Sequence, residues 1–185
     1  LLNSPVSGSQ AAQSIPTAIV ERVDVFPDFT PVELGTANLA GAVNFVSRRH
    51  FDDTDLGELS LSYGSFDTRS IEATTWGETS GWSLIGGIQH ASADNNYPVD
   101  EDLFRTTTKH RLNNGYSTDS GFLIAAKEFS NVAIRTMFQH VDQHNELATT
   151  RNRLADNAFI DNKASRLQLA MDYGFGGFEA GNRFY

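Results

Sequence analysis

The chain has 185 residues, no cysteine and a formal net charge of −9, with 23 acidic residues against 14 lysines and arginines. The acidic balance argues against a nucleic-acid-binding protein, which normally carries a basic face, and the lack of cysteine excludes disulfides and thiolate metal sites. No run approaches the roughly 20 apolar residues of a membrane-spanning helix. The chain is therefore either soluble or crosses a membrane as strands, whose alternating pattern is compatible with the low mean hydropathy of −0.34.

The first 49 residues differ from the rest and are predicted to form part of a small domain. Two short apolar segments, 18–26 and 42–46, flank a turn-rich connection at 27–41. We expect the two segments to pair as strands across that connection. The acidic stretch 50–56 that follows is typical of a solvated linker.

From Gly57 onward, apolar and polar residues alternate in short runs, which predicts strands. The expected strands are 58–63, 68–76, 82–92, 119–129, 131–141, 165–173 and 178–185. Short turns at 64–67, 77–81, 130–131 and 174–177 join some of them, whereas 93–117 and 142–164 are predicted to be long polar connections. The chain is therefore predicted to be all-β, with about seven antiparallel strands after residue 57.

The lengths of the expected connections alternate along this region. Turns after the second, fourth and sixth strands are very short, and those after the third and fifth are long. Short turns at one rim and long loops at the other are typical of an outer-membrane barrel, whereas a soluble sandwich has no reason to separate them. In a barrel, one set of apolar residues would face lipid: Leu59, Leu61, Leu167, Leu169 and Met171. In a soluble, secreted all-β binding or adhesion module, which is the alternative, the same residues would pack inward.

Seven strands cannot close a transmembrane barrel, because an open edge would leave backbone groups unsatisfied in the bilayer. The chain also begins without the basic and apolar regions of a signal peptide. We therefore expect the sequence to be part of a longer chain.

Several segments resemble the TonB-dependent outer-membrane receptor family. Ile-Pro at 15–16 with Val-Glu-Arg-Val-Asp-Val at 20–25 is similar to a late segment of the family's plug domain, and residues 34–48 to its plug-closing motif. Tyr-Gly-Ser-Phe at 63–66 resembles the first barrel hairpin, and Asn-Asn-Tyr-Pro at 95–98 a motif after the third strand. Two positions depart from the family pattern. Pro-Asp-Phe at 27–29 stands where Arg-Gly-Pro is frequent, and Ala40 replaces the first glycine of a Gly-Gly pair.

The resemblance implies a domain organisation and a function. Residues 1–49 would be the C-terminal part of the plug, 50–56 a linker, and 57–185 the incomplete N-terminal part of a transmembrane antiparallel β-barrel. The whole protein would be a receptor in the bacterial outer membrane that imports a scarce small extracellular ligand, most often an iron-siderophore complex or cobalamin. The TonB energy-transducing complex would act on a segment outside this sequence. Outer-membrane lipid is the other expected partner, and neither a cofactor nor nucleic acid is expected.

No catalytic motif is present: the sequence lacks a G-x-S-x-G elbow, a phosphate-binding loop and H-E-x-x-H, so we expect no enzyme. Candidate ligand contacts lie in the long segment after the third strand, where aromatic and basic side chains gather. They are Tyr97, Phe104, Arg105 and Arg111. A solvated loop whose charges serve only solubility is the alternative.

Three residues at i, i+2 and i+4 could ligate a divalent metal if the fifth strand continues through them: His140, Asp142 and His144. A polar rim that leaves the membrane is the favoured interpretation, because no supporting groups behind these ligands are evident. Aromatic residues also flank two short turns, which fits an interfacial girdle at the periplasmic side; core packing in a soluble sheet is the alternative. They are Trp76 and Trp82 at one turn, and Tyr173 and Phe175 at another.

Overall fold

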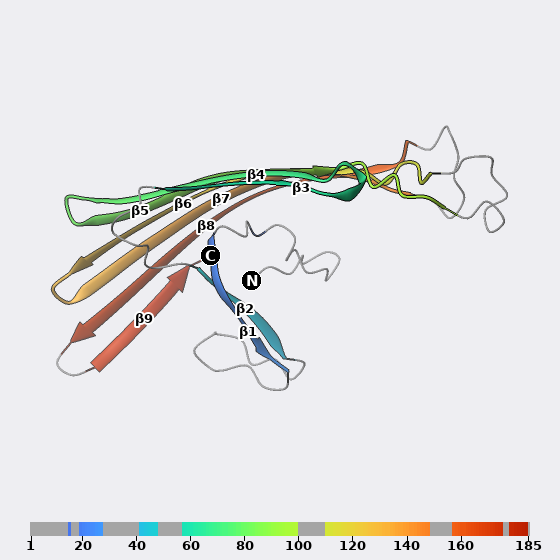
Figure 1. Ribbon diagram of the computed structural model, residues 1–185. Coiled ribbons are helices and arrows are strands. Elements are labelled where there is room, and N and C mark those ends of the chain that lie inside the picture. The colour runs from blue at the N-terminus through green and yellow to red at the C-terminus, as the bar shows by residue number, and fades with distance from the viewer. Residues whose placement is uncertain are drawn as a thin grey trace. The chain divides into compact units, whose positions relative to one another are not determined.

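The computed structural model describes residues 15, 19–27, 41–47, 57–99, 110–148, 157–175 and 178–184, with the backbone alone for Phe175 and 178–184. This part of the chain is all-β, as predicted, with antiparallel sheets (Figure 1). The chain divides into two compact units, one within residues 2–55 and one within 56–185.

The first unit contains a two-stranded sheet. Strands β1 (Val20–Phe26) and β2 (Ala42–Ser47) pair antiparallel, with Val25 opposite Val43. The expected pairing of these two segments is confirmed. Gly41 enters β2 with φ +84°, and a Cβ at this position would lie 2.3 Å from the Phe26 carbonyl oxygen. Only glycine fits there, because it lacks a Cβ and adopts positive φ freely.

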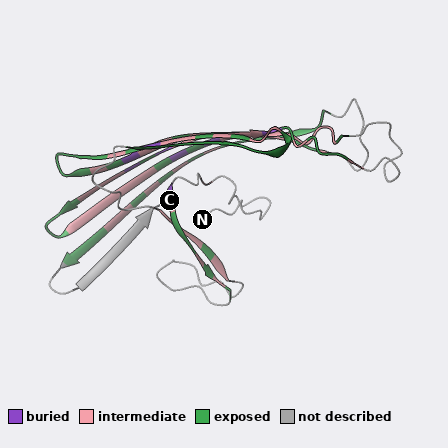
Figure 2. Cartoon of the chain, in the orientation of Figure 1, coloured by how far each residue is buried: buried purple, intermediate pink, exposed green. Residues whose placement is uncertain are grey.

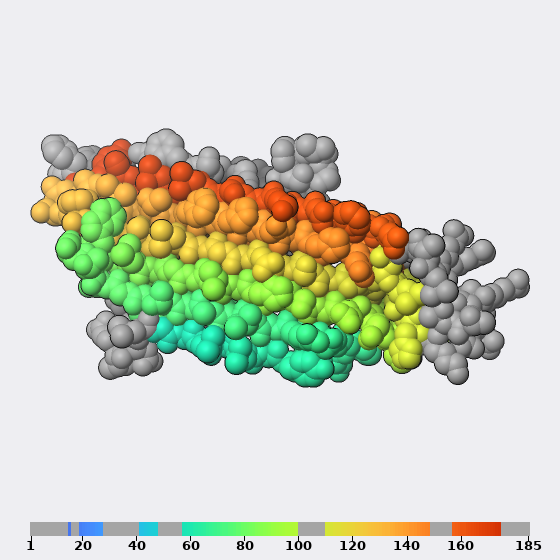
Figure 3. Space-filling model, turned by 90° about the horizontal axis from the view of Figure 1, so that it is seen from above, coloured from blue at the N-terminus to red at the C-terminus, as the bar shows by residue number. Residues whose placement is uncertain are grey.

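The second unit is one seven-stranded antiparallel sheet in chain order (Figure 1). Figure 3 shows the coloured part of this sheet with its strands side by side in that order. Its strands are β3 (Gly57–Tyr63), β4 (Arg69–Thr79), β5 (Trp82–Ala93), β6 (Tyr116–Phe129), β7 (Val132–Glu146), β8 (Phe159–Phe175) and β9 (Phe178–Phe184). A single 3-10 turn, η4 (Ser65–Asp67), lies between β3 and β4. Every strand pairs with its neighbour in sequence, as a β-meander does.

Several strands extend beyond their predicted ends. The polar connection predicted at 142–164 is confined to 147–158, and its predicted ends are wrong, since β7 runs to Glu146 and β8 begins at Phe159. These polar strand ends are held by side chains that pair across the two strands. Lys163 donates to Asp142 at 2.7 Å, and His144 lies 2.6 Å from Asp161. Strand β4 also runs to Thr79, so the turn before β5 consists of two residues alone.

The cross-strand register divides the side chains of the sheet between two faces. Successive strands pair one row of residues, which therefore share a face that we name face A: Leu61, Ile71, His90, Asp119, Asp142 and Lys163. Face A also carries every second residue along each strand from these, and face B carries the residues between them. The predicted separation on β8 follows this pattern, with Leu167 and Leu169 on face A and Arg166 and Gln168 on face B.

The two faces differ in exposure. The buried residues of the sheet all lie on face B of β4 to β7 (Figure 2): Thr74, Ile85, Ala93, Phe122, Ile124, Gln139 and Val141. Large apolar side chains on face A are exposed instead. The contrast is sharpest within β6, where Phe122 and Ile124 are 6% and 2% exposed, but Leu123 between them is 51% exposed. In the described part of the chain, face A is therefore an exposed surface with a strongly apolar middle.

Candidate functional site

The two ends of the sheet are built differently. At one end, residues 64–68, 94–115 and 147–158 connect β3 to β4, β5 to β6 and β7 to β8, and we name this end the loop rim. At the other end, the two-residue turns Ser80-Gly81 and Ser130-Asn131 join the strands, and we name it the turn end (Figure 1). The candidate ligand residues Tyr97 and Arg111 fall at the loop rim.

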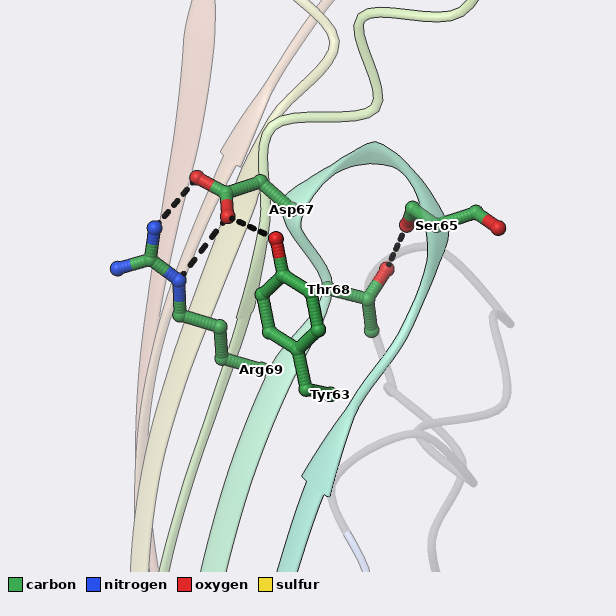
Figure 4. Close-up of polar contacts among 5 residues, drawn as sticks. All are labelled: Tyr63, Ser65, Asp67, Thr68 and Arg69. Atoms are coloured by element: carbon green, nitrogen blue, oxygen red, sulfur yellow. Dashed lines mark hydrogen bonds and ion pairs between the residues drawn. The ribbon is translucent and has the colours of Figure 1, made fainter.

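The β3–β4 turn is fixed by a three-residue polar cluster (Figure 4). Arg69 donates two hydrogen bonds to the Asp67 carboxylate, from Nε to Oδ1 at 3.2 Å and from a terminal nitrogen to Oδ2 at 2.6 Å. The Tyr63 hydroxyl donates to Oδ1 at 3.3 Å. Hydrogen bonding from Arg69 holds the pKa of the Asp67 carboxyl below its usual value, and the Tyr63 hydroxyl acts in the same direction. Two-point binding of this kind orients the planar guanidinium.

This turn holds the start of the β5–β6 connection. The backbone N–H groups of Asp94 and Asn95 both donate to the Phe66 carbonyl oxygen at 3.2 Å. The Phe66 ring meets the Tyr97 ring edge to face, with centroids 6.0 Å apart. Tyr97, 40% exposed, is thus held in place by a neighbouring turn while part of its ring stays open to solvent.

Asparagine side chains brace the β5–β6 connection and join it to the β7–β8 connection. Asn95 donates to the Asn114 carbonyl at 3.1 Å, and Asn114 returns a bond to the Asn95 carbonyl at 3.4 Å. Asn113 donates to the carbonyls of both Leu147 and Ala158, at 2.8 and 2.9 Å, and so closes the stem of the β7–β8 connection. Asn95 and Asn113 have φ of 51° and 53°, a left-handed conformation in which asparagine is enriched. Sequence reasoning missed this network, although the run Asn-Asn-Gly at 113–115 is a turn signal.

The structure places two of the four candidate ligand residues next to each other. Pro98 and His110 form an isolated antiparallel bridge, and the Arg111 backbone N–H donates to the Tyr97 carbonyl at 2.8 Å. Tyr97 and Arg111 therefore sit on paired segments at the stem of the β5–β6 connection. Phe104 and Arg105 lie outside the described residues.

The three candidate metal ligands share face A of β7, because the strand continues through them. Each contacts its partner on β8 rather than the other two: His140 Nδ1 lies 2.8 Å from Ser165 Oγ, and Asp142 and His144 contact Lys163 and Asp161. In the described part of the chain, no group of three or more His, Cys, Asp or Glu side chains is arranged to hold a metal ion.

Aromatic side chains gather on face A at the turn end, around Lys127. The Lys127 ammonium lies 5.4 Å from the Trp82 ring centroid and 5.5 Å from that of Phe129. Tyr173 is in the same row as Phe129 through Val132. The expectation that Trp76 joins this group is wrong. Because β4 runs to Thr79, which pairs with Trp82, Trp76 falls on face B.

No family model matches the sequence, and neither a curated protein nor a solved structure matches it. Among the described residues, no helix has the length and apolar character needed to span a membrane.

Proposed function

We propose that this chain is part of a TonB-dependent outer-membrane receptor that imports a scarce small ligand, with residues 57–185 contributing strands to a transmembrane β-barrel. The observation that carries the proposal is the exposed apolar middle of face A. Leu59, Leu61, Leu167 and Leu169 are between 40% and 68% exposed. Contiguous exposed apolar patches of this extent mark a surface that meets a membrane or a partner.

The dimensions of the apolar band suit a bilayer. On β5 it runs from Trp82 through Leu84 and Ile88 and ends at His90. The row of His90 on face A contains the charged residues Asp119, Asp142 and Lys163. The distance from Trp82 to His90 is roughly 26 Å along the strand at about 3.3 Å per residue, and outer-membrane barrels carry an apolar band about 25 Å tall. Strands β4 to β8, of 11 to 17 residues, are long enough for a crossing, which needs roughly 9–11 residues.

The band also runs obliquely across the sheet. On β3 the leucine of the band that lies nearest the loop rim is Leu61, which is in register with Lys163 on β8. The outermost leucine of β8 on this face is Leu167, four residues closer to the turn end. Four residues of offset over five inter-strand spacings correspond to a tilt of about 30°, near the 35–45° of barrel strands. Strands tilted in a flat membrane would present such a band.

Aromatic residues flank the band at both ends, as in the girdles of outer-membrane barrels. Trp82, Phe129 and Tyr173 lie at the turn end, and Tyr63 and Phe159 at the loop rim, all on face A. The short turns and longer connections are likewise separated between the two ends. In an outer-membrane barrel the turn end faces the periplasm and the loop rim faces outward.

The soluble alternative expects a second layer over the leucines of face A. Among the described residues, Leu59, Leu61, Leu167 and Leu169 are exposed. A receptor explains that exposure without a further layer. The proposal of import and energy coupling is based on the plug-like motifs of residues 15–48. The aromatic and basic residues of the loop rim form a surface suited to capturing a ligand.

Adjacent residues on β8 provide a matched test of the lipid-facing side. Leu169→Arg places a charge in the middle of face A, and we expect a loss of about 2–4 kcal/mol in folding free energy in phospholipid vesicles. Gln168→Arg, on face B, should change it by less than about 1 kcal/mol. Equal effects of the two substitutions would contradict the proposed orientation.

Orientation and transport can both be tested in cells. Cysteine labelling reports the orientation, because these 185 residues contain no cysteine of their own. Ser65→Cys at the loop rim should react with a membrane-impermeant maleimide in intact cells, and Ser80→Cys at the turn end should react only after lysis. Iron-starved cells that carry the protein should then accumulate ferric siderophore, or cobalamin in a parallel assay, only when TonB is present. Uptake of neither cargo class above that of a deletion strain would count against the importer.

A further inference from the structure

Lys127 is held in a specific position on face A at the turn end. Its ammonium donates to the Ser80 carbonyl at 3.0 Å and lies over the rings of Trp82 and Phe129. A lysine ammonium has three N–H donors, and one of them is used by Ser80. The aromatic faces attract the ammonium through cation–π interactions. The side chain is therefore a positioned cation with donor capacity left.

Among the described residues of face A near the turn end, no opposite charge accompanies this cation. In the three rows of face A nearest the turn end, every described residue except Lys127 is uncharged. These residues are Gly77, Thr79, Trp82, Leu84, Ala125, Phe129, Val132, Ile134, Thr136, Leu169, Met171 and Tyr173. Glu78, Glu128 and Asp172 lie on face B.

The opposite end of the same face is arranged differently. There, Lys163 pairs with Asp142 at 2.7 Å, and Arg69 with Asp67 at 2.6 Å. These two basic groups at the loop rim thus have carboxylate partners within the protein, whereas no described carboxylate on face A pairs with Lys127 at the turn end. An anion that complements Lys127 would therefore have to come from outside the protein, on the side of face A.

We propose that Lys127, with Trp82 and Phe129 beside it, binds the phosphodiester of a phospholipid headgroup at the boundary of the apolar band. The inference rests on the proposed function, since it requires face A to meet the bilayer. The acyl chains would lie along the leucines of face A, and the phosphate oxygens would accept the remaining Lys127 N–H donors. The two rings would restrict the lysine side chain and exclude water from part of the contact.

The test compares phospholipid retention by matched lysine variants. Detergent-released protein is mixed with phosphatidylglycerol, and bound lipid is counted by native mass spectrometry. We expect Lys127→Gln to lower the bound fraction about five-fold, while Lys127→Arg keeps it. Lys163→Gln, which removes a lysine from face A at the loop rim, should leave it unchanged. Equal retention by the original protein and Lys127→Gln would overturn the proposal.

Two further probes identify the recognised chemistry. Diacylglycerol with the same acyl chains lacks the phosphate, so it should bind more weakly than phosphatidylglycerol and be insensitive to Lys127→Gln. Equal binding of the two lipids would show that only the chains are recognised and would overturn the headgroup site. Inorganic phosphate should not displace the lipid, and displacement would point to a free-phosphate site instead.

A fluorescence measurement separates this inference from the function on which it rests. In a Trp76→Phe background, the remaining tryptophan of these 185 residues is Trp82. Vesicles that contain brominated phospholipid should quench its emission, in Lys127→Gln as well as in the parent. Absence of quenching would overturn both the membrane location and the lipid site. Quenching together with unchanged phosphatidylglycerol retention would overturn the Lys127 site alone.

Discussion

Gly115 and Glu146 exchange two hydrogen bonds at the point where β6 begins and β7 ends. The Gly115 N–H donates to Glu146 Oε2 at 2.7 Å, and the Glu146 N–H donates to the Gly115 carbonyl at 2.9 Å. The second bond continues the β6–β7 ladder one residue beyond Tyr116 and Asn145. A Cβ on Gly115 would lie 3.0 Å from the same carboxylate oxygen. The carboxylate therefore anchors the β5–β6 connection to the neighbouring strand.

Removing this carboxylate should loosen the loop rim without unfolding the sheet. In Glu146→Ala, Gly115 loses its acceptor, and we expect its amide to exchange with solvent about two- to five-fold faster. Glu146→Gln keeps an acceptor oxygen and should have a smaller effect. Hydrogen exchange read by mass spectrometry checks this, with Glu128→Ala on face B at the turn end as the control. Unchanged exchange at 113–115 in Glu146→Ala would show that the carboxylate does not anchor the rim.

Two adjacent glycines of β5 provide a second prediction, because they lie on opposite faces. A Cβ at Gly87 would lie 2.6 Å from the Phe122 ring, and one at Gly86 would meet Leu123 at an ordinary 3.6 Å. Phe122 is 6% exposed and has little room to move. Gly87→Ala should therefore lower the unfolding free energy by about 1–3 kcal/mol, and Gly86→Ala by much less.

A partner substitution identifies the cause of that loss. If the ring is responsible, Phe122→Leu should reduce the additional cost of Gly87→Ala, and a double-mutant cycle would measure the coupling. Denaturant unfolding in a membrane-mimicking medium is the measurement. Additive effects of the two substitutions would mean that the backbone contact with the Ala73 carbonyl, 3.0 Å from the same Cβ, dominates instead.

The faces of the sheet were predictable from sequence because side chains alternate along a strand, and one residue of register exchanges the faces. Leu59, Leu61, Leu167 and Leu169 fall on a common face for that reason. The same rule explains the error at Trp76. The turn was expected at 77–81, and the extension of β4 to Thr79 fixes which residues oppose Trp82.

The loop rim was less predictable, because its hydrogen bonds join residues far apart in sequence. Asn113 donates to the Ala158 carbonyl across 45 positions, and no local pattern specifies such a partner. The polar ends of β7 and β8 were interpreted as a connection for a related reason. Each end has few apolar residues, and pairs such as Asp142 with Lys163 support it only once the strands are aligned.

The Asp67 cluster leads to a prediction about pH. Hydrogen bonding from Arg69 lowers the pKa of Asp67 in the folded protein. The ionised carboxylate therefore stabilises the β3–β4 turn above the ordinary aspartate pKa of about 3.9. This contribution is lost as the pH falls through the lower, folded-state pKa. The turn should keep its order in mild acid and lose it only below that ordinary value.

Carbon-detected NMR of the Asp67 carboxyl should follow this titration directly. In Arg69→Gln the pKa should rise toward the ordinary value, because both guanidinium hydrogen bonds are removed. Tyr63→Phe, which removes only the 3.3 Å contact, should raise it less, and Lys163→Gln should leave it unchanged. Identical titration in the parent and Arg69→Gln would mean that the guanidinium does not stabilise the carboxylate in solution. The order of the turn would then have to come from its backbone bonds, such as that from the Gly64 N–H to the Thr68 carbonyl.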